Sequence, residues 1–294
     1  MSKGTMKALL GATGAALAAA TAFAMPSFGD WSTPVNMEAL PGSSTEVNSD
    51  SIDGCASIST DGLTLAFNSF RTGNQQIYLA SRSSTSEGFG MPEMLPAPIN
   101  GPGIESCPTI THGNRLYFTS SRGDAGDLFV SKLGPKGWSD PERLGSNVNN
   151  IGTVEESVSI FEDDQGREVL VFSRRPAGPF VGPGGKIYQS VARAPASLVE
   201  GGPHSLSSDN RPSVTHDGRT IFWDSQRAGS LGVVDIWRAT RSNTSEPWSQ
   251  AVQLSQVNTN GPDTRPFVSW DGEMLLVSAA NDMWFATREK ISGN

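Results

Sequence analysis

The sequence predicts an all-β fold, a five-bladed β-propeller closed by an N-terminal strand in the last blade. Three observations predict it: a short phrase recurs five times, each repeat reads as short alternating strands, and the N-terminus carries the one strand that the last repeat lacks. A period of about 50 residues built from short β segments is typical of propellers, in which each repeat forms one four-stranded blade.

The repeated phrase begins with an acid and continues through two variable residues, usually a proline, then Ser or Thr and Ile or Val. The acids that open the five repeats are Asp53, Glu105, Glu155, Asp209 and Asp263. Their spacing of about 50 residues accounts for nearly all of the 294-residue chain. We therefore expect one closed domain rather than two small ones.

Each repeat alternates apolar and polar residues in short runs, which Gly, Asn, Asp and Pro separate. In the second repeat the runs are 106–111, 116–120, 127–131 and 138–144. Runs of this length, rich in aromatic and β-branched residues, indicate strands joined by tight turns. Each repeat therefore predicts one four-stranded sheet.

The last repeat ends early, because its third expected strand, 283–288, lies close to the C-terminus. Residues 31–36 read Trp-Ser-Thr-Pro-Val-Asn and match the start of the fourth strand of the second repeat, Trp-Ser-Asp-Pro at 138–141. A closed ring leaves no sheet edge free for pairing with other chains. We therefore expect residues 31–36 to pair with 283–288 and complete the last blade.

The repeats resemble the WD-like repeats of TolB-type propellers. The likeness rests on PTITHGNRLYFTSSRGDAGDLF at 108–129, PSVTHDGRTIFWDSQR at 212–227 and WSDPERLGSNVN at 138–149, and it extends over roughly residues 31 to 288. The resemblance implies an exported propeller and carries over no catalytic motif. Members serve as scaffolds, in cell-envelope assemblies and as parts of enzymes, so it implies a fold rather than a reaction.

The first 24 residues predict a secretory signal peptide. Lys3 and Lys7 precede an apolar, Ala-rich stretch at 9–20, and Ala22 and Ala24 fit a cleavage site. This stretch is shorter than the 20 or so residues that span a bilayer. We therefore expect no membrane span, and a secreted or periplasmic protein whose propeller domain covers 25–294.

The composition narrows the range of partners. The formal net charge is −8 and no Lys/Arg-rich stripe is present. A nucleic-acid partner is therefore not expected, because such proteins present a basic surface to phosphates. A small anionic ligand or a protein partner remains, and we expect a monomer.

The five acids allow two interpretations. As a ring around the axis they could bind calcium, which prefers several oxygen ligands, or two of them could act as an acid and a base on a sugar. Alternatively, each acid caps the amides of its own turn or bonds the neighbouring blade. All five repeats retain the acid, as a structural role predicts.

The position two residues after each acid varies, and we call it the axial position. It holds Cys55, Cys107, Ser157, Arg211 and Arg265. The two arginines offer forked donors suited to a carboxylate, sulfate or phosphate, unless they neutralise Asp209 and Asp263. The two cysteines could form a disulfide, remain free thiols or bind a soft metal. One further candidate is His204, which stands where other repeats have Asn48, Asn100, Asn150 and Asn258.

Two functions follow from these candidates. The first is an exported binding or scaffold protein that recognises its ligand or partner through the central funnel or one face. The alternative is a carbohydrate-active hydrolase or lyase that uses funnel carboxylates and holds an acidic sugar on Arg211 and Arg265. Two carboxyl groups about 5–9 Å apart at a pocket would favour the enzyme, and acids bonded to backbone would favour the scaffold.

Overall fold

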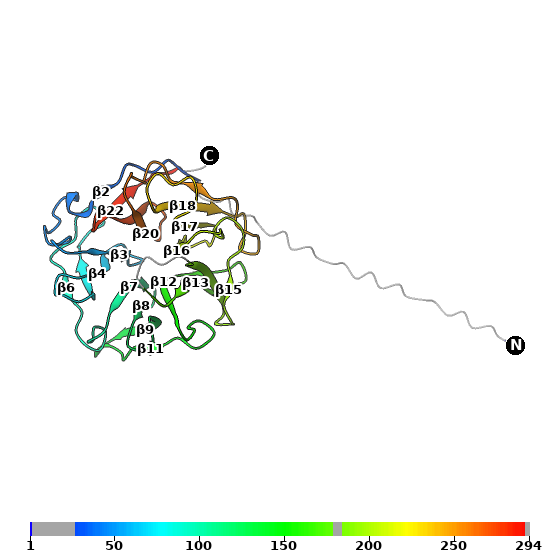
Figure 1. Ribbon diagram of the computed structural model, residues 1–294, viewed down its shortest axis with the longest axis horizontal. Helices are drawn as coiled ribbons and strands as arrows, with labels where there is room; N and C mark the ends of the chain where they lie inside the picture. Colours follow the sequence, from blue (N-terminus) through cyan, green and yellow to red (C-terminus); the bar gives the residue numbers. More distant parts are fainter. Residues whose placement is uncertain (2–26, 179–183, 292–294) are drawn as a thin grey trace.

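The structure is a computed structural model that describes Met1 and residues 27–178 and 184–291. Five sheets surround a common axis (Figure 1), and the one helix in these residues is the 3-10 turn Met37–Ala39. This arrangement confirms the predicted all-β, five-bladed propeller. Apart from Met1, the expected signal peptide at 1–24 lies outside the described residues.

We name the sheets blades A to E in chain order. Blade A contains β3 (Asp53–Ile58), β4 (Thr64–Ser69), β5 (Gln76–Ser81) and β6 (Glu93–Met94). Blade B contains β7 (Glu105–Thr111), β8 (Arg115–Ser120) and β9 (Asp127–Gly134), with β10 (Gly137–Trp138) and β11 (Glu142–Arg143) both paired to β9. Blade C contains β12 (Thr153–Glu162), β13 (Glu168–Pro176), β14 (Lys186–Val191) and β15 (Ser197–Leu198). Blade D contains β16 (Asp209–Val214), β17 (Thr220–Ser225), β18 (Asp235–Thr240) and β19 (Val252–Gln253).

Blade E draws its strands from both ends of the chain. Three of them are β20 (Asp263–Val268), β21 (Met274–Ala279) and β22 (Asp282–Thr287), and the fourth is β2 (Val35–Asn36). In the ladder Val35 lies opposite Phe285 and Asn36 opposite Trp284. The predicted closure by the N-terminal strand is therefore confirmed. A further pair, β1 (Ser27–Phe28) with β23 (Lys290–Ile291), joins the two ends again.

The apolar residues of the strands form the core between neighbouring blades, and blades D and E show how. Trp31, just before β2, is buried and packs edge to face on Phe222 of blade D, with ring centroids 6.0 Å apart. Burial of large aromatic side chains supplies much of the driving force for folding. The segment that closes the ring therefore also contributes to the core.

Four buried asparagines link successive blades. Asn100 accepts a hydrogen bond from the Ile77 amide and donates one to the Ile77 carbonyl, each at 2.8 Å. The same exchange joins Asn48 to Met283, Asn149 to Leu128 and Asn258 to Ile236. In the third repeat the linking residue is therefore Asn149 rather than Asn150, because that repeat has one more residue before its acid.

Every innermost strand carries a β-bulge at the axial position. The register of each ladder shifts there. The φ angles are 52° at Cys55, 46° at Cys107, 56° at Ser157, 48° at Arg211 and 56° at Arg265. A side-chain-bearing residue rarely adopts this left-handed backbone, and a bulge re-aims its side chain. The five variable residues are thus presented in one common way.

No helix among the described residues is long and apolar enough to cross a membrane.

Candidate functional site at the propeller axis

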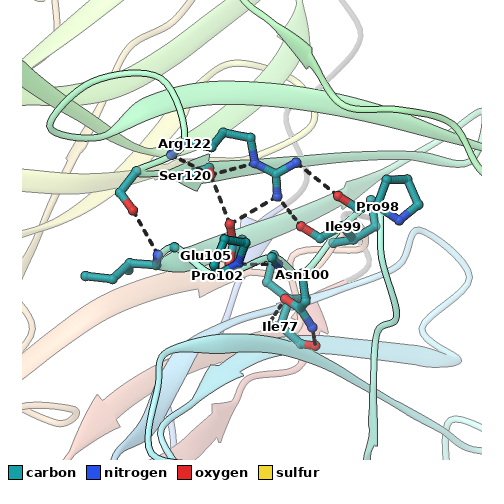
Figure 2. Close-up of polar contacts among 12 residues, drawn as sticks. Ile77, Pro98, Ile99, Asn100, Pro102, Glu105, Ser120 and Arg122 are labelled. Atoms are coloured by element: carbon teal, nitrogen blue, oxygen red, sulfur yellow. Dashed lines mark hydrogen bonds and ion pairs between the residues drawn. The ribbon is translucent and has the colours of Figure 1, made fainter.

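The five repeated acids lie in the interior of the blades, and Figure 2 shows the arrangement in blade B. Glu105 is fully buried, accepts a hydrogen bond from Ser120 Oγ at 3.1 Å and pairs with Arg122 at 3.0 Å. Arg122 also donates to the carbonyls of Pro98 and Ile99. Acid and arginine therefore tie the second strand to the loop that precedes the first.

Three other blades repeat this pair. The arginine–carboxylate distances are 3.0 Å for Arg71 and Asp53, 2.7 Å for Arg174 and Glu155, and 2.6 Å for Arg227 and Asp209. The acids also accept hydrogen bonds from their own turns, as Asp53 does from the amide and hydroxyl of Ser49 at 2.6 and 2.7 Å. Of the two interpretations of these acids, the structure therefore shows the one in which each acid serves its own turn and blade, and four of the five are not free funnel carboxylates.

Under the other interpretation, the ring of acids could bind calcium. Four of the five acids already face a guanidinium group, which occupies the place that a cation would need. In the described part of the chain no group of three or more His, Cys, Asp or Glu side chains is placed to hold a metal ion. The repeated acids therefore do not form the calcium site that the ring would have provided.

The axial residues do come together. Cys55, Cys107, Ser157, Arg211 and Arg265 all line one cavity of about 20 Å³. Cys55 and Cys107 form a disulfide between blades A and B, which was one of three readings of these thiols. The Cys55 sulfur also lies 3.5 Å from Ser157 Oγ. One wall of the cavity is therefore a disulfide and a hydroxyl, and the other carries two arginines.

Arg211 is neutralised by two carboxylates that we did not single out from the sequence. Its guanidinium lies 3.5 Å from Glu156 and 3.3 Å from Asp224. The expected partners, Asp209 and Asp263, are not among its ion pairs, because Asp209 pairs with the arginine of its own blade. The two carboxylates outweigh the effect of burial and raise the pKa of Arg211 above its usual range.

Arg265 differs from Arg211, because no carboxylate of the described residues lies within ion-pair distance of its guanidinium. Its Nη1 donates to Thr264 Oγ1 at 3.3 Å, whereas Nε is buried and has no hydrogen-bond partner in the described structure. Burial, followed by repulsion from Arg211, lowers the pKa of Arg265 to about 10. Arg265 is therefore a cation whose charge is poorly compensated beside a cavity.

Glu156 and Asp224 are both buried, yet their pKa values shift in opposite directions. Burial raises the pKa of the Asp224 carboxyl. Burial also opposes ionisation of Glu156, but Arg211, Arg175 and Arg265 together lower its pKa. Two carboxyl groups whose environments separate their pKa values are suited to act as an acid and a base.

These two carboxylates could have been found in the sequence by comparing the repeats at other positions. Glu156 directly follows its repeated acid, where the other repeats have Gly54, Ser106, Asn210 and Thr264. Asp224 directly precedes the last residue of β17, where blades A, B and E have Asn68, Thr119 and Ser278. In both sets a single repeat carries an acid. Neither position was among the variable positions singled out above, so both acids were missed.

His204 does not join this site. It is exposed, whereas the asparagines that occupy the related place in the other repeats are buried. The residue before it, Pro203, is buried and has no side-chain amide with which to make the hydrogen bonds that the asparagines make. Among the described residues this loop has no asparagine link, and Lys186 of blade C instead donates to the carbonyls of Ser205 and Ser207. No described cavity at the axis includes His204.

No protein-family profile matches the chain, and no curated protein matches its sequence. Several solved structures share its fold. The arabinanase of Bacillus subtilis has a TM-score of 0.55 at 11% identity, over 82% of this chain and 95% of that one. The family-62 α-L-arabinofuranosidase of Coprinopsis cinerea has a TM-score of 0.55 at 12% identity, over 90% and 98%. A thermostable family-43 glycoside hydrolase has a TM-score of 0.53 at 12% identity, over 86% and 93%.

TolB from Acinetobacter baumannii has a TM-score of 0.49 at 16% identity and is too distant to carry an argument. The other likenesses show a shared fold, and at these identities they do not transfer an activity. The neighbours nevertheless correct our first expectation, a binding or scaffold protein, because most of them are glycoside hydrolases. They favour the carbohydrate-active alternative.

Proposed function

We propose that this chain is a hydrolase of acidic carbohydrates that works at the axial cavity. The observation that carries the proposal is Arg265, a poorly compensated cation beside a cavity that also adjoins the Arg211 cluster. A guanidinium group offers a planar fork of donors that matches the two oxygens of a carboxylate or sulfate. The carboxylate or sulfate of an acidic sugar would supply the negative partner that the guanidinium of Arg265 lacks.

Glu156 and Asp224 are the carboxyl pair of the proposed reaction. Both contact the guanidinium of Arg211, so their oxygens lie no farther apart than the upper limit of about 9.5 Å for carboxyl pairs in glycoside hydrolases. Asp224, with its raised pKa, suits the general acid that protonates the leaving oxygen. Glu156, with its lowered pKa, suits the carboxylate that stays ionised.

The size of the cavity sets a condition on this mechanism. At about 20 Å³ it admits a group the size of a water molecule or little more. Arg265 is partly exposed as a residue, although its Nε is buried, so the guanidinium lies between the cavity and the surface. The acid group of the sugar would bind Arg265 first, and the side chain would then move aside so that the glycosidic bond reaches the two carboxyl groups.

The TolB-type repeats form the propeller scaffold that carries this site. We propose that the chain belongs with TolB-type repeat propellers in its repeats, on the residues at 108–129 and 212–227. That assignment is independent of the reaction, because unrelated activities occur on propellers.

The test is hydrolysis of galacturonate oligosaccharides, with neutral arabinose oligosaccharides beside them, followed through new reducing ends. We expect release from the acidic substrate, lost in Asp224→Asn and in Glu156→Gln. Asp140→Asn, at an exposed position, is the matched control and should retain activity. Activity should fall as the pH rises past the raised pKa of Asp224 and as it drops through the lowered pKa of Glu156. The proposal is contradicted if the protein neither cleaves nor binds acidic oligosaccharides.

A further inference from the structure

Blade E breaks an arrangement that the other four blades share. In blades A to D an arginine from the end of the second strand reaches the repeated acid, and these residues are Arg71, Arg122, Arg174 and Arg227. In blade E the corresponding segment is Ala279, Ala280 and Asn281, in place of a Ser-x-Arg sequence. Blade E therefore keeps the acid, Asp263, without the cation that accompanies it elsewhere.

Blade D shows how the fold binds a guanidinium group at this place. Arg227 contacts the Asp209 carboxylate at 2.6 Å and donates to Ser225 Oγ at 3.0 Å and to the Gly202 carbonyl at 2.8 Å. Blade B repeats the set with a carboxylate, a serine hydroxyl and two loop carbonyls (Figure 2). The polar partners of the guanidinium are thus an acid on the first strand, a serine hydroxyl and nearby backbone carbonyls.

Aromatic rings complete the place. The guanidinium carbon of Arg227 lies 5.2 Å from the ring of Trp237, and that of Arg174 lies 4.4 Å from the ring of Tyr188. Both rings come from the third strand of their blade. A guanidinium group over an aromatic face gains a favourable cation–π interaction. The third strand of blade E carries Trp284 at the corresponding position.

In blade E this place is an open cavity of about 230 Å³. Its lining includes Asp263, Val257, Val277, Ala279 and Trp284, which stand at the positions that surround the arginine in other blades. None of its lining residues belongs to the axial cavity. The volume is below the 300 Å³ or so at which drug-sized pockets begin and suits a group the size of an amino-acid side chain.

The acid at the base of this cavity lacks a compensating charge. Asp263 is fully buried, and its hydrogen bonds come from the amide of Thr259 at 2.6 Å and from the Thr259 hydroxyl. Burial raises the pKa of Asp263, and the nearby buried carboxylate of Asp235 raises it further. A buried carboxylate is costly unless it is paired. The cavity therefore favours a cation.

We propose that the cavity of blade E is a binding site for a guanidinium group from another molecule. The group would pair with Asp263, lie against Trp284 and take the position that an arginine of the same chain fills in blades A to D. Four examples within one molecule define the ligand as a guanidinium on an alkyl stem. A lysine ammonium is a compact point charge without the planar fork, so it should fit less well.

The guanidinium can come from free arginine or from an arginine side chain of a peptide. Three probes separate these sources and the chemistry: L-arginine, N-acetyl-arginine amide and N-acetyl-citrulline amide, the last a neutral molecule of the same shape. Saturable binding is measured by calorimetry and as a shift of the melting temperature, because a ligand of the folded state raises it. We expect the arginine amide to bind and the citrulline amide not to bind. Equal binding of free arginine would indicate a small-molecule source, and binding of the amide alone a peptide.

Two variants locate the site. Asp263→Asn should abolish binding while the protein stays folded. Ala279 lies opposite Asp263 in the ladder, as Arg174 lies opposite Glu155 in blade C. Ala279→Arg should therefore rebuild the acid–arginine pair of blade C, raise the melting temperature and block the probe. Should that variant fail to fold, Asp263→Asn still decides the matter.

The matched control is Arg71→Ala, which opens the corresponding place in blade A beside Asp53. The arginine amide should recover part of the stability that this variant loses. The proposal is overturned if the wild-type protein shows no saturable binding of the arginine amide, or if Asp263→Asn binds it unchanged.

Discussion

Blades D and E are neighbours that use their arginines in opposite ways. In blade D, Arg227 pairs with Asp209 and Arg211 pairs with Glu156 and Asp224. In blade E, the acid has no arginine and Arg265 has no ion-pair partner among the described residues. The difference teaches that a repeated residue with its repeated partner serves the fold. A place where the partner is missing is available for a ligand.

The largest difference between the two blades lies in their outer strand. In blade D, β19 follows β18 along the chain, whereas the outer strand of blade E comes from the N-terminus. Deletion of residues 25–37 should expose the edge of β22 and remove the buried Trp31. We expect loss of cooperative unfolding or aggregation, seen by thermal melting and size-exclusion chromatography. An unchanged melting temperature would refute the role of this strand.

The next largest loss of stability should come from removing the arginine that pairs with the repeated acid. Arg227→Ala leaves the buried Asp209 carboxylate without its ion pair, which should cost about 3–5 kcal/mol. The matched change in blade E, Asn281→Ala, removes an exposed side chain at a φ of 70° and should cost no more than about 1–2 kcal/mol. Denaturant midpoints measure both. Equal losses in the two blades would show that the comparison is wrong.

Substitution of the two axial arginines should likewise cost different amounts of stability. Arg211→Ala leaves Glu156 and Asp224 buried without their shared cation and should cost about 3 kcal/mol. Arg265→Ala removes a charge that repels Arg211 and should cost less than about 1 kcal/mol. Chemical unfolding of the two single variants checks this order, and a larger loss for Arg265→Ala contradicts it.

The smallest effect concerns pH. Because the folded-state pKa of Asp263 is raised, its contribution to stability is present below the model-compound value of 3.8 and is lost as the pH rises through the folded pKa. Asp263→Asn removes this loss, so the variant should be more stable than the wild type at pH 7. The gain should shrink as the pH is lowered toward 3.8. Urea midpoints across this range test the sign, and a destabilised variant at pH 7 would contradict it.

The repeat made the fold predictable, because one phrase marks each innermost strand and the Trp-Ser-Thr-Pro segment at 31–34 marks the missing outer one. The axial position was also predictable as the place where the repeats differ. The partners of Arg211 were not, because they depend on which strand of which blade faces the axis. Glu156 and Asp224 lie on first and second strands of different blades, and only the folded ring brings them to one guanidinium.

The vacant place in blade E was visible as a pattern but had no meaning before the fold was known. The sequence shows Ser-x-Arg after the second strand in three repeats and Ala-Ala-Asn in the last. That the arginine meets the repeated acid follows from the ladder, which sets Asp209 opposite Ser225 and Asp263 opposite Ala279. The cavity then appears where the side chain is absent.

The most direct test of the proposed function is calorimetric titration of a galacturonate trimer and of a neutral arabinose trimer into the wild type and into Arg265→Ala. The poorly compensated charge of Arg265 predicts binding of the acidic trimer, little binding of the neutral one, and loss of the acidic signal in the variant. Arg265→Ala should keep its fold, so the loss would report on recognition. Equal binding of both trimers, or an acidic trimer that binds the variant unchanged, would contradict the assignment of the axial cavity to an acidic sugar.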